Sequence, residues 1–287
     1  MNISELVGTT AQRLARALGL DPREARLEAR ILVGHAMTTD RAWLIAHDQD
    51  TPTHAQCLAV ESLVSRRESG EPVAYILGER EFYGRRFKVN PEVLIPRPET
   101  ELLVETALER LPKNKPLEAL DIGTGSGCIA VTLALESPFW SVTAVDISSP
   151  ALQLAKENAQ RLGARIRFIQ SDLYAELGGQ HFDLIVSNPP YIAQEDPHLQ
   201  RGDVRFEPRA ALTSGMEGLN AIRAIASAAP RHLKTEGLLL MEHGFEQGSA
   251  CRQILEYNGF HGVSSHRDLA GLERITEGRL PAAGIDH

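Results

Sequence analysis

The stretch Asp121-Ile122-Gly123-Thr124-Gly125-Ser126-Gly127 follows an apolar strand expected at residues 117–122 and precedes a helix expected at 128–135. Glycines at such a turn let the backbone bend tightly and approach a ligand, because no Cβ stands in the way. Asp146 ends the next expected strand, roughly 20 residues on, where a carboxylate accepts hydrogen bonds from both hydroxyls of a ribose. The motif therefore predicts a parallel α/β sheet with a ribose-containing ligand at the carboxyl ends of its strands.

Two classes of ligand fit this loop. Gly125-Ser126-Gly127-Cys128-Ile129-Ala130 satisfies the dinucleotide pattern G-x-G-x-x-A, so a nicotinamide or flavin enzyme is one alternative. Asp121 favours the other, because a carboxylate before the glycines receives the ammonium group of a methionine moiety but repels a pyrophosphate. We therefore expect S-adenosylmethionine as the cofactor, with Asp146 at its ribose. The remaining contacts are expected from Asp121, Ile122, Gly123, Thr124 and Gly125.

Asp172 follows the third expected strand, at residues 166–169. A carboxylate at this place accepts the exocyclic amine of an adenine, with Leu173 packing against the ring. A strand-end cap without any ligand explains Asp172 equally well, so both interpretations stay open.

The most specific signal is Asn188-Pro189-Pro190-Tyr191, which follows the strand expected at 182–186 and is expected two strands from the glycine loop in the sheet. Successive prolines have no N–H to donate and restrict the backbone, so the loop is stiff and rich in acceptors. The Asn188 side-chain oxygen and the Pro189 carbonyl match the two donors of an NH2 group. As such a nitrogen attacks a methyl group, positive charge grows on it and fixed acceptors stabilise the transition state. We predict Asn188, Pro189 and Tyr191 as catalytic residues, with Tyr191 as an aromatic wall and Pro190 completing the substrate loop, and Asn188 also contacting the cofactor.

The chain divides into three expected regions. Residues 1–71 are interpreted as a small helical domain, with helix starts at Asp21-Pro22 and Thr51-Pro52. Residues 72–98 are interpreted as a linker with a hairpin turning around Gly84. Residues 99–287 alternate strands and helices, which predicts a Rossmann-like, seven-stranded α/β sheet.

Further elements are expected on either side of these motifs. In the first region, Leu27, Ile31, Leu32 and Ala36 lie near helical spacing. The later part of the third region is expected to hold a helix at 219–233, a strand at 238–241 and two closing strands near 263–267 and 273–277.

Composition and charge exclude several functions. The 287 residues are 43% hydrophobic and 24% charged, without an apolar run long enough for a spanning helix or a secretion signal at the N-terminus. The formal net charge of −8 argues against stable binding to nucleic acid. Three scattered cysteines and ten histidines without ligand spacing predict a cytoplasmic protein with no metal site.

The two loops resemble those of the class I methyltransferases that modify glutamine in translation proteins. The resemblance is strongest to the release factor glutamine methyltransferases, the PrmC or HemK family, and it covers nearly the whole chain. It includes Leu94-Ile95-Pro96-Arg97-Pro98-Glu99-Thr100-Glu101, Arg205-Phe206-Glu207-Pro208 and Ala211-Leu212. Where that family often has an aromatic residue after the third strand, this chain has Leu173.

The resemblance implies a specific reaction. The substrate would be the glutamine of the Gly-Gly-Gln loop of peptide chain release factors, methylated at N5, with S-adenosylhomocysteine as the other product. It assigns residues 121–125 and Asp146 to the cofactor, residues 188–191 to the glutamine, and the helical domain to the release factor, for an enzyme expected to be monomeric. A sibling that methylates a ribosomal protein, an amino-methyltransferase of nucleic acid bases and a regulator without catalysis remain as alternatives.

Overall fold

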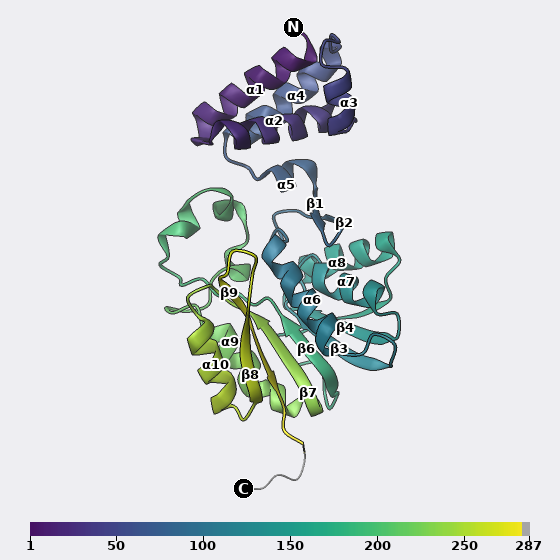
Figure 1. The fold of residues 1–287 in the computed structure, drawn as a ribbon, viewed down its shortest axis with the longest axis vertical. Helices are drawn as coiled ribbons and strands as arrows, with labels where there is room; N and C mark the ends of the chain where they lie inside the picture. Colours follow the sequence, from purple (N-terminus) through teal and green to yellow (C-terminus); the bar gives the residue numbers. More distant parts are fainter. Residues whose placement is uncertain (283–287) are drawn as a thin grey trace. The chain divides into compact units, whose positions relative to one another are not determined.

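The computed structural model describes residues 1–282 and divides the chain into two compact units (Figure 1). The helical unit combines Met1–Glu79 with Gln200–Phe206, and the sheet unit combines Arg80–Leu199 with the chain from Glu207 onward. Within residues 1–282, none of the helices is long and apolar enough to cross a membrane.

The helical unit is built from short amphipathic helices with defined caps. Asp21 caps the second helix, as expected, by accepting from the backbone of Arg23 and Glu24. The expected start at Thr51-Pro52 is wrong: Thr53 is the N-cap of the fourth helix and forms a capping box with Gln56. In chain order the helices are α1 (Ile3–Leu18), α2 (Pro22–Ala36), α3 (Arg41–Ala46), α4 (His54–Glu68) and α5 (Val73–Leu77).

The buried face of α2 differs from the one that apolar spacing suggested. Leu32 is fully buried, but Leu27 and Ile31 are 50% and 38% exposed. Their places toward the core are taken by the small side chains of Ala25 and Ala29, which allow α1 and α4 to pack closely against α2. Two of the four residues at helical spacing, Leu27 and Ile31, therefore lie on the outer surface of this unit.

Residues 200–206 complete the helical unit although they lie far along the chain. The Arg67 guanidinium, which is almost fully buried, donates to Glu28 at 2.8 and 3.0 Å and to Asp203 at 2.9 Å. Arg205 donates to the Ser69 carbonyl at 3.2 Å and packs against Gly70, where a Cβ would collide with it. A buried arginine is stable only when its donors are satisfied, so this segment is part of the unit's structure.

The sheet unit carries the strands that the sequence predicted. The segment predicted as a linker, residues 72–98, contains α5, which belongs to the helical unit, and the hairpin β1–β2. The elements of the sheet unit are β1 (Glu79–Phe82), β2 (Arg85–Lys88), α6 (Glu101–Arg110), β3 (Leu117–Ile122), α7 (Cys128–Glu136), β4 (Trp140–Asp146), α8 (Ser149–Leu162), β5 (Ile166–Gln170), β6 (Phe182–Ser187), α9 (Asn220–Ala228), β7 (Leu233–Glu242), α10 (Gly248–Tyr257), β8 (His261–Arg267) and β9 (Glu273–Arg279), with short 3₁₀ turns η1 (Pro98–Thr100), η2 (Pro197–Gln200), η4 (Arg209–Ala211) and η5 (Ala229–Arg231), while η3 (Asp203–Phe206) belongs to the helical unit.

The main sheet has seven strands in the order β5-β4-β3-β6-β7-β9-β8. The first five in this order are parallel, and β9 and β8 are antiparallel to their neighbours. The fold class predicted from the sequence is therefore confirmed. The expected separation of the two loops is wrong, because β3 and β6 are hydrogen-bonded neighbours and no strand lies between them.

Helices cover both faces of this sheet, with α6, α7 and α8 on one face and α9 and α10 on the other (Figure 1). Side chains alternate between these faces along each strand. In β3, Ala119 packs with α7 and Leu120 with α9; in β7, Leu240 and Leu239 alternate in the same way. Asp121 and Glu242 therefore face the same side of the sheet, toward α6 and α7, at the carboxyl ends of their strands.

One expected helix is shorter than the pattern suggested. The helix expected at 219–233 ends at Ala228, where Pro230 falls within the turn η5. The chain then enters β7 at Leu233, five residues before the expected strand. A register shift against β6 and the positive φ of Glu236 interrupt the early part of β7, which hides it from an apolar pattern.

Candidate active site

A cavity of about 540 Å³ opens at the carboxyl ends of β3, β4 and β6. In a parallel sheet this edge is where ligands bind, next to the point at which the strand order reverses. Most of the predicted site residues line it, namely Ile122, Gly123, Thr124, Gly125, Asp146, Asp172, Leu173, Asn188, Pro189 and Pro190. Asp121 and Tyr191 are not among its lining residues.

The glycine loop is held in place by the neighbouring strand. The amides of Gly123 and Thr124 both donate to the Val145 carbonyl, at 2.9 and 3.0 Å. Gly127 has a φ of +81°, and a Cβ there would lie 3.1 Å from the Cβ of Ala155 on α8. A larger residue at 127 would push α7 away from α8, so this glycine serves the close packing of the loop.

Asp146 organises the ribose end of the cavity. Its Oδ2 accepts from the Gly125 amide and its Oδ1 from the Ser148 amide, both at 2.9 Å. Burial raises the pKa of this carboxyl, while these backbone donors oppose the rise. Each oxygen keeps a lone pair for a further donor, so the group can both shape the loop and receive two hydroxyls.

Asp121 lies beneath the glycine loop and is fully buried. Its Oδ2 accepts from the Thr124 hydroxyl at 2.7 Å, whereas Oδ1 has no hydrogen-bond partner within the described residues. Burial raises the pKa of the Asp121 carboxyl to about 7. An unpartnered buried oxygen is unusual and marks a group with a function beyond packing.

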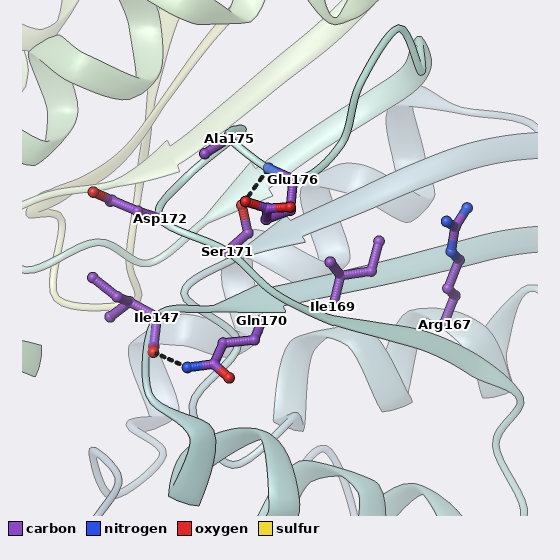
Figure 2. A pocket seen from close by; sticks show the side chains of 8 residues that line it. All are labelled: Ile147, Arg167, Ile169, Gln170, Ser171, Asp172, Ala175 and Glu176. Atoms are coloured by element: carbon purple, nitrogen blue, oxygen red, sulfur yellow. Dashed lines mark hydrogen bonds between the residues drawn. The ribbon is translucent and has the colours of Figure 1, made fainter.

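The adenine end of the expected site borders a second pocket of about 490 Å³ (Figure 2). Ile147, Ser171 and Asp172 line both spaces, and Gln170 Nε2 donates to the Ile147 carbonyl at 3.2 Å (Figure 2). Ile147 is an exposed apolar side chain that no sequence motif predicted to lie at the site. Leu173 has a φ of +49°, a conformation that is strained for a leucine, and it lines only the main cavity.

In the loop after β6, the side-chain nitrogen of Asn188 is hydrogen-bonded and, among the described residues, its side-chain oxygen is not. Nδ2 donates to the hydroxyl of Thr100 at 3.1 Å, while Oδ1 is buried without a partner within residues 1–282. Ser187 Oγ donates to the Ile122 carbonyl at 2.7 Å, which ties the start of the loop to the glycine loop's strand. The side-chain oxygen that the sequence predicted as an acceptor is therefore available to a donor.

Tyr191 does not line the cavity, and its hydroxyl contacts the end of β7. Its hydroxyl donates to Glu242 Oε1 at 3.3 Å, and its carbonyl accepts from Gln247 Nε2 at 3.0 Å. Burial raises the pKa of the Tyr191 hydroxyl, which keeps it a neutral donor. Neither Thr100 nor Glu242 was predicted from the sequence to have a role, because contacts between residues so far apart in the chain leave no local pattern.

Two buried polar side chains near the cavity have structural roles. His243 is buried, with Nε2 2.9 Å from Thr276 Oγ1, and does not line the cavity. Glu207 has a fully buried side chain that accepts from the Arg97 guanidinium and from the Ile95 amide. This pair anchors the chain before Pro208 and Ala211, which form part of the cavity wall.

Comparison with known proteins gives consistent matches. The family models "PrmC N-terminal domain" and "Methyltransferase small domain" match residues 5–78 and 99–204. The release factor glutamine methyltransferase of Bordetella pertussis is 53% identical over 268 residues, covering 93% of this chain and 99% of the relative. The counterpart from Escherichia coli K12 is 46% identical over 255 residues, covering 88% of this chain and 92% of the relative. A crystal structure of a methyltransferase from Pyrococcus furiosus superposes with a TM-score of 0.53 at 17% identity, covering 76% of this chain and 97% of that one.

The strand order and these matches define an S-adenosylmethionine-dependent methyltransferase with a Rossmann-like sheet. The dinucleotide alternative is thereby excluded. The chain belongs to the release factor glutamine methyltransferase family.

Proposed function

We propose that this chain transfers a methyl group from S-adenosylmethionine to N5 of the glutamine in the Gly-Gly-Gln loop of peptide chain release factors. The observation that carries the proposal is Asn188 Oδ1, a buried acceptor without a partner on a proline-stiffened loop beside the cavity. Family membership supports the release factor as the partner, since the relatives are named for that substrate.

The chemistry requires fixed acceptors at the target nitrogen. The lone pair of an amide nitrogen is delocalised into its carbonyl, so the nitrogen attacks only weakly. Asn188 Oδ1 and the Pro189 carbonyl would accept from its two N–H groups and stabilise the positive charge that develops during attack. When bound, S-adenosylmethionine supplies an activated methyl group: an N–C bond forms, the S–C bond breaks, and the nitrogen then loses a proton to water.

The cavity fits this cofactor at several points. Asp146 keeps two lone pairs for ribose hydroxyls, and the backbone of Gly123 and Gly125 follows the edge of the cavity without side chains. Asp121 Oδ1 is unpartnered, as expected of a carboxylate that binds an ammonium group, although the side chain is enclosed beneath the loop. Thr124 and Ile122 complete this wall.

The proposed binding site for the adenine of the cofactor is supported by fewer contacts than the ribose site. Asp172 and Leu173 line the cavity beyond β5, where they would receive the exocyclic amine and pack against the ring. Asn188 begins the substrate loop and lines the same cavity as the proposed cofactor residues, so it is placed to contact both ligands. Tyr191 would border the glutamine through the loop that it anchors, since its hydroxyl is engaged by Glu242.

We further propose that residues 1–71 recognise the release factor and that residues 99–287 carry the chemistry. The enzyme is expected to act as a monomer in the cytoplasm, without a metal and without stable binding to nucleic acid or membranes. The acidic net charge supports the last point. Methyl transfer to an amide needs no Lewis acid when acceptors and donor are held in line.

The test is transfer from labelled S-adenosylmethionine to a purified release factor whose Gly-Gly-Gln glutamine is intact or replaced. We expect label only on the intact factor. Label that persists after replacement would refute the assignment of the glutamine. Transfer to a ribosomal protein or to nucleic acid, with none to the release factor, would refute the proposed substrate in favour of the corresponding alternative.

A further inference from the structure

A buried carboxyl lies behind the substrate loop. Glu242, the last residue of β7, is 1% exposed, and its Oε1 accepts from the Tyr191 hydroxyl at 3.3 Å. Oε2 is buried and has no partner at hydrogen-bond distance within the described residues. Burying a carboxyl with so few partners costs stability, so its presence points to a function at this place.

Thr100 connects this carboxyl to Asn188. The Thr100 side chain is buried, and its Oγ1 accepts from Asn188 Nδ2 at 3.1 Å. The Thr100 hydroxyl also lies close enough to the Glu242 carboxyl to lower its pKa by hydrogen bonding. The three side chains, from the residue before α6, the loop after β6 and the end of β7, therefore form one cluster of polar groups beside the cavity.

The direction of the hydrogen bonds within this cluster determines whether Asn188 presents its oxygen or its NH2 group to the substrate. An ionised carboxylate has acceptors only, so it takes the hydroxyl protons of both Tyr191 and Thr100. Thr100 then keeps only lone pairs for Asn188, which must turn its NH2 toward Thr100. The opposite end of the amide, Oδ1, is thereby directed to the incoming substrate as an acceptor.

A protonated Glu242 permits the reverse direction. Its O–H can donate to Thr100, and the Thr100 proton can then go to Asn188 Oδ1. Asn188 would present its NH2 to the NH2 of the substrate, so that two donors face each other. The ionisation of one buried carboxyl thus selects between a productive and an unproductive orientation of the amide.

We infer that Glu242 is a positioning residue for methyl transfer, because through Thr100 it holds the Asn188 amide with its oxygen toward the substrate and directly holds Tyr191. The inference rests on the proposed function, since the orientation matters only if Asn188 receives an NH2 group. It adds two residues, Glu242 and Thr100, that need not touch either ligand to determine the rate.

The charges around Glu242 set the pH range of this effect. Burial and, to a smaller extent, the nearby Glu99 raise the pKa of Glu242 to about 7. Thr100, Tyr191 and Arg274 oppose the rise, and the buried thiol of Cys128 on α7 is a further titratable group beside it. The fraction of enzyme in which Glu242 is ionised, and therefore active, increases as pH rises through about 7.

The experiment compares wild-type enzyme with Glu242→Gln in a pH series, using saturating S-adenosylmethionine and purified release factor. We expect kcat of the wild type to rise through about pH 7, and Glu242→Gln to lose that step and fall by roughly 10- to 100-fold with little change in KM. Glutamine keeps the shape of the side chain but brings a donor to Thr100. Affinity for S-adenosylmethionine, measured by calorimetry, should not change.

Two further variants separate positioning from stability. Thr100→Val breaks the link and should lower kcat as Glu242→Gln does, whereas Thr100→Ser keeps the hydroxyl and should restore most of it. Glu256→Gln, at an exposed glutamate of α10, is the matched control and should keep wild-type kcat. A Glu242→Gln or Thr100→Val enzyme with wild-type kcat and pH profile would overturn the inference. No transfer by the wild type at any pH would instead refute the proposed function, and this inference with it.

Discussion

Asp121→Asn should stabilise the protein at neutral and higher pH. Burial raises the pKa of Asp121 from 3.8 to about 7, so the folded state favours the protonated carboxyl. The contribution of this group to the free energy of unfolding is fully present below its unfolded-state pKa and is lost as pH rises toward about 7. Asparagine does not titrate, and its oxygen can still accept from Thr124. At roughly 1.4 kcal/mol per pH unit, its advantage over the wild type should grow by about 2 to 3 kcal/mol between about pH 5 and about pH 8.

Urea unfolding followed by tryptophan fluorescence measures this effect. The chain has two tryptophans: Trp43 lies in the helical unit and Trp140 is buried at the start of β4. In a Trp43→Phe background, Trp140 reports the sheet unit that contains Asp121. A stability difference between the aspartate and asparagine proteins that stays constant with pH would show that the Asp121 carboxyl is not held protonated by burial, and the reasoning would fail.

Three other substitutions or deletions test the site. Asn188→Ala should lower kcat at least about 100-fold, because it removes a fixed acceptor for the reacting nitrogen; near-normal turnover by a folded variant would exclude that role. Asp146→Ala should weaken affinity for S-adenosylmethionine by about 100-fold, from the loss of hydrogen bonds to a charged group; calorimetry that finds unchanged affinity would remove the ribose assignment. Deleting residues 1–70 should preserve cofactor binding but impair methylation of the intact release factor; full activity on that protein would contradict the recognition role.

The sequence predicted the sheet well where strands are continuous and apolar. The expected strands at 117–122, 141–145, 166–169 and 182–186 agree with β3 to β6 within a residue at either end. The strands β3, β4 and β6 are largely buried and therefore form continuous apolar runs, and the edge strand β5 keeps Ile166, Phe168 and Ile169 half-buried. The early part of β7 was missed for the opposite reason. Its polar residues and the left-handed Glu236 interrupt any apolar pattern, and only pairing with β6 makes it a strand.

The residues of the candidate site that belong to local sequence motifs could be predicted. The glycine loop and Asn188-Pro189-Pro190 line one cavity because the ends of parallel strands meet at one edge of a sheet. The partners of Asn188 and Tyr191 were not predictable, since Thr100 and Glu242 lie 88 and 51 residues away from them. Such contacts are fixed by sheet order, which one sequence does not determine.

The discontinuous make-up of the helical unit has a consequence for how the chain is synthesised. A ribosome releases α1 to α5 long before residues 200–206, yet Asp203 is one of the partners of the buried Arg67. Until that stretch emerges, Arg67 has only Glu28 and nearby carbonyls to satisfy its donors. The first unit to leave the ribosome is thus finished only after most of the sheet unit's parallel strands have followed, which makes the order of folding differ from the order of synthesis.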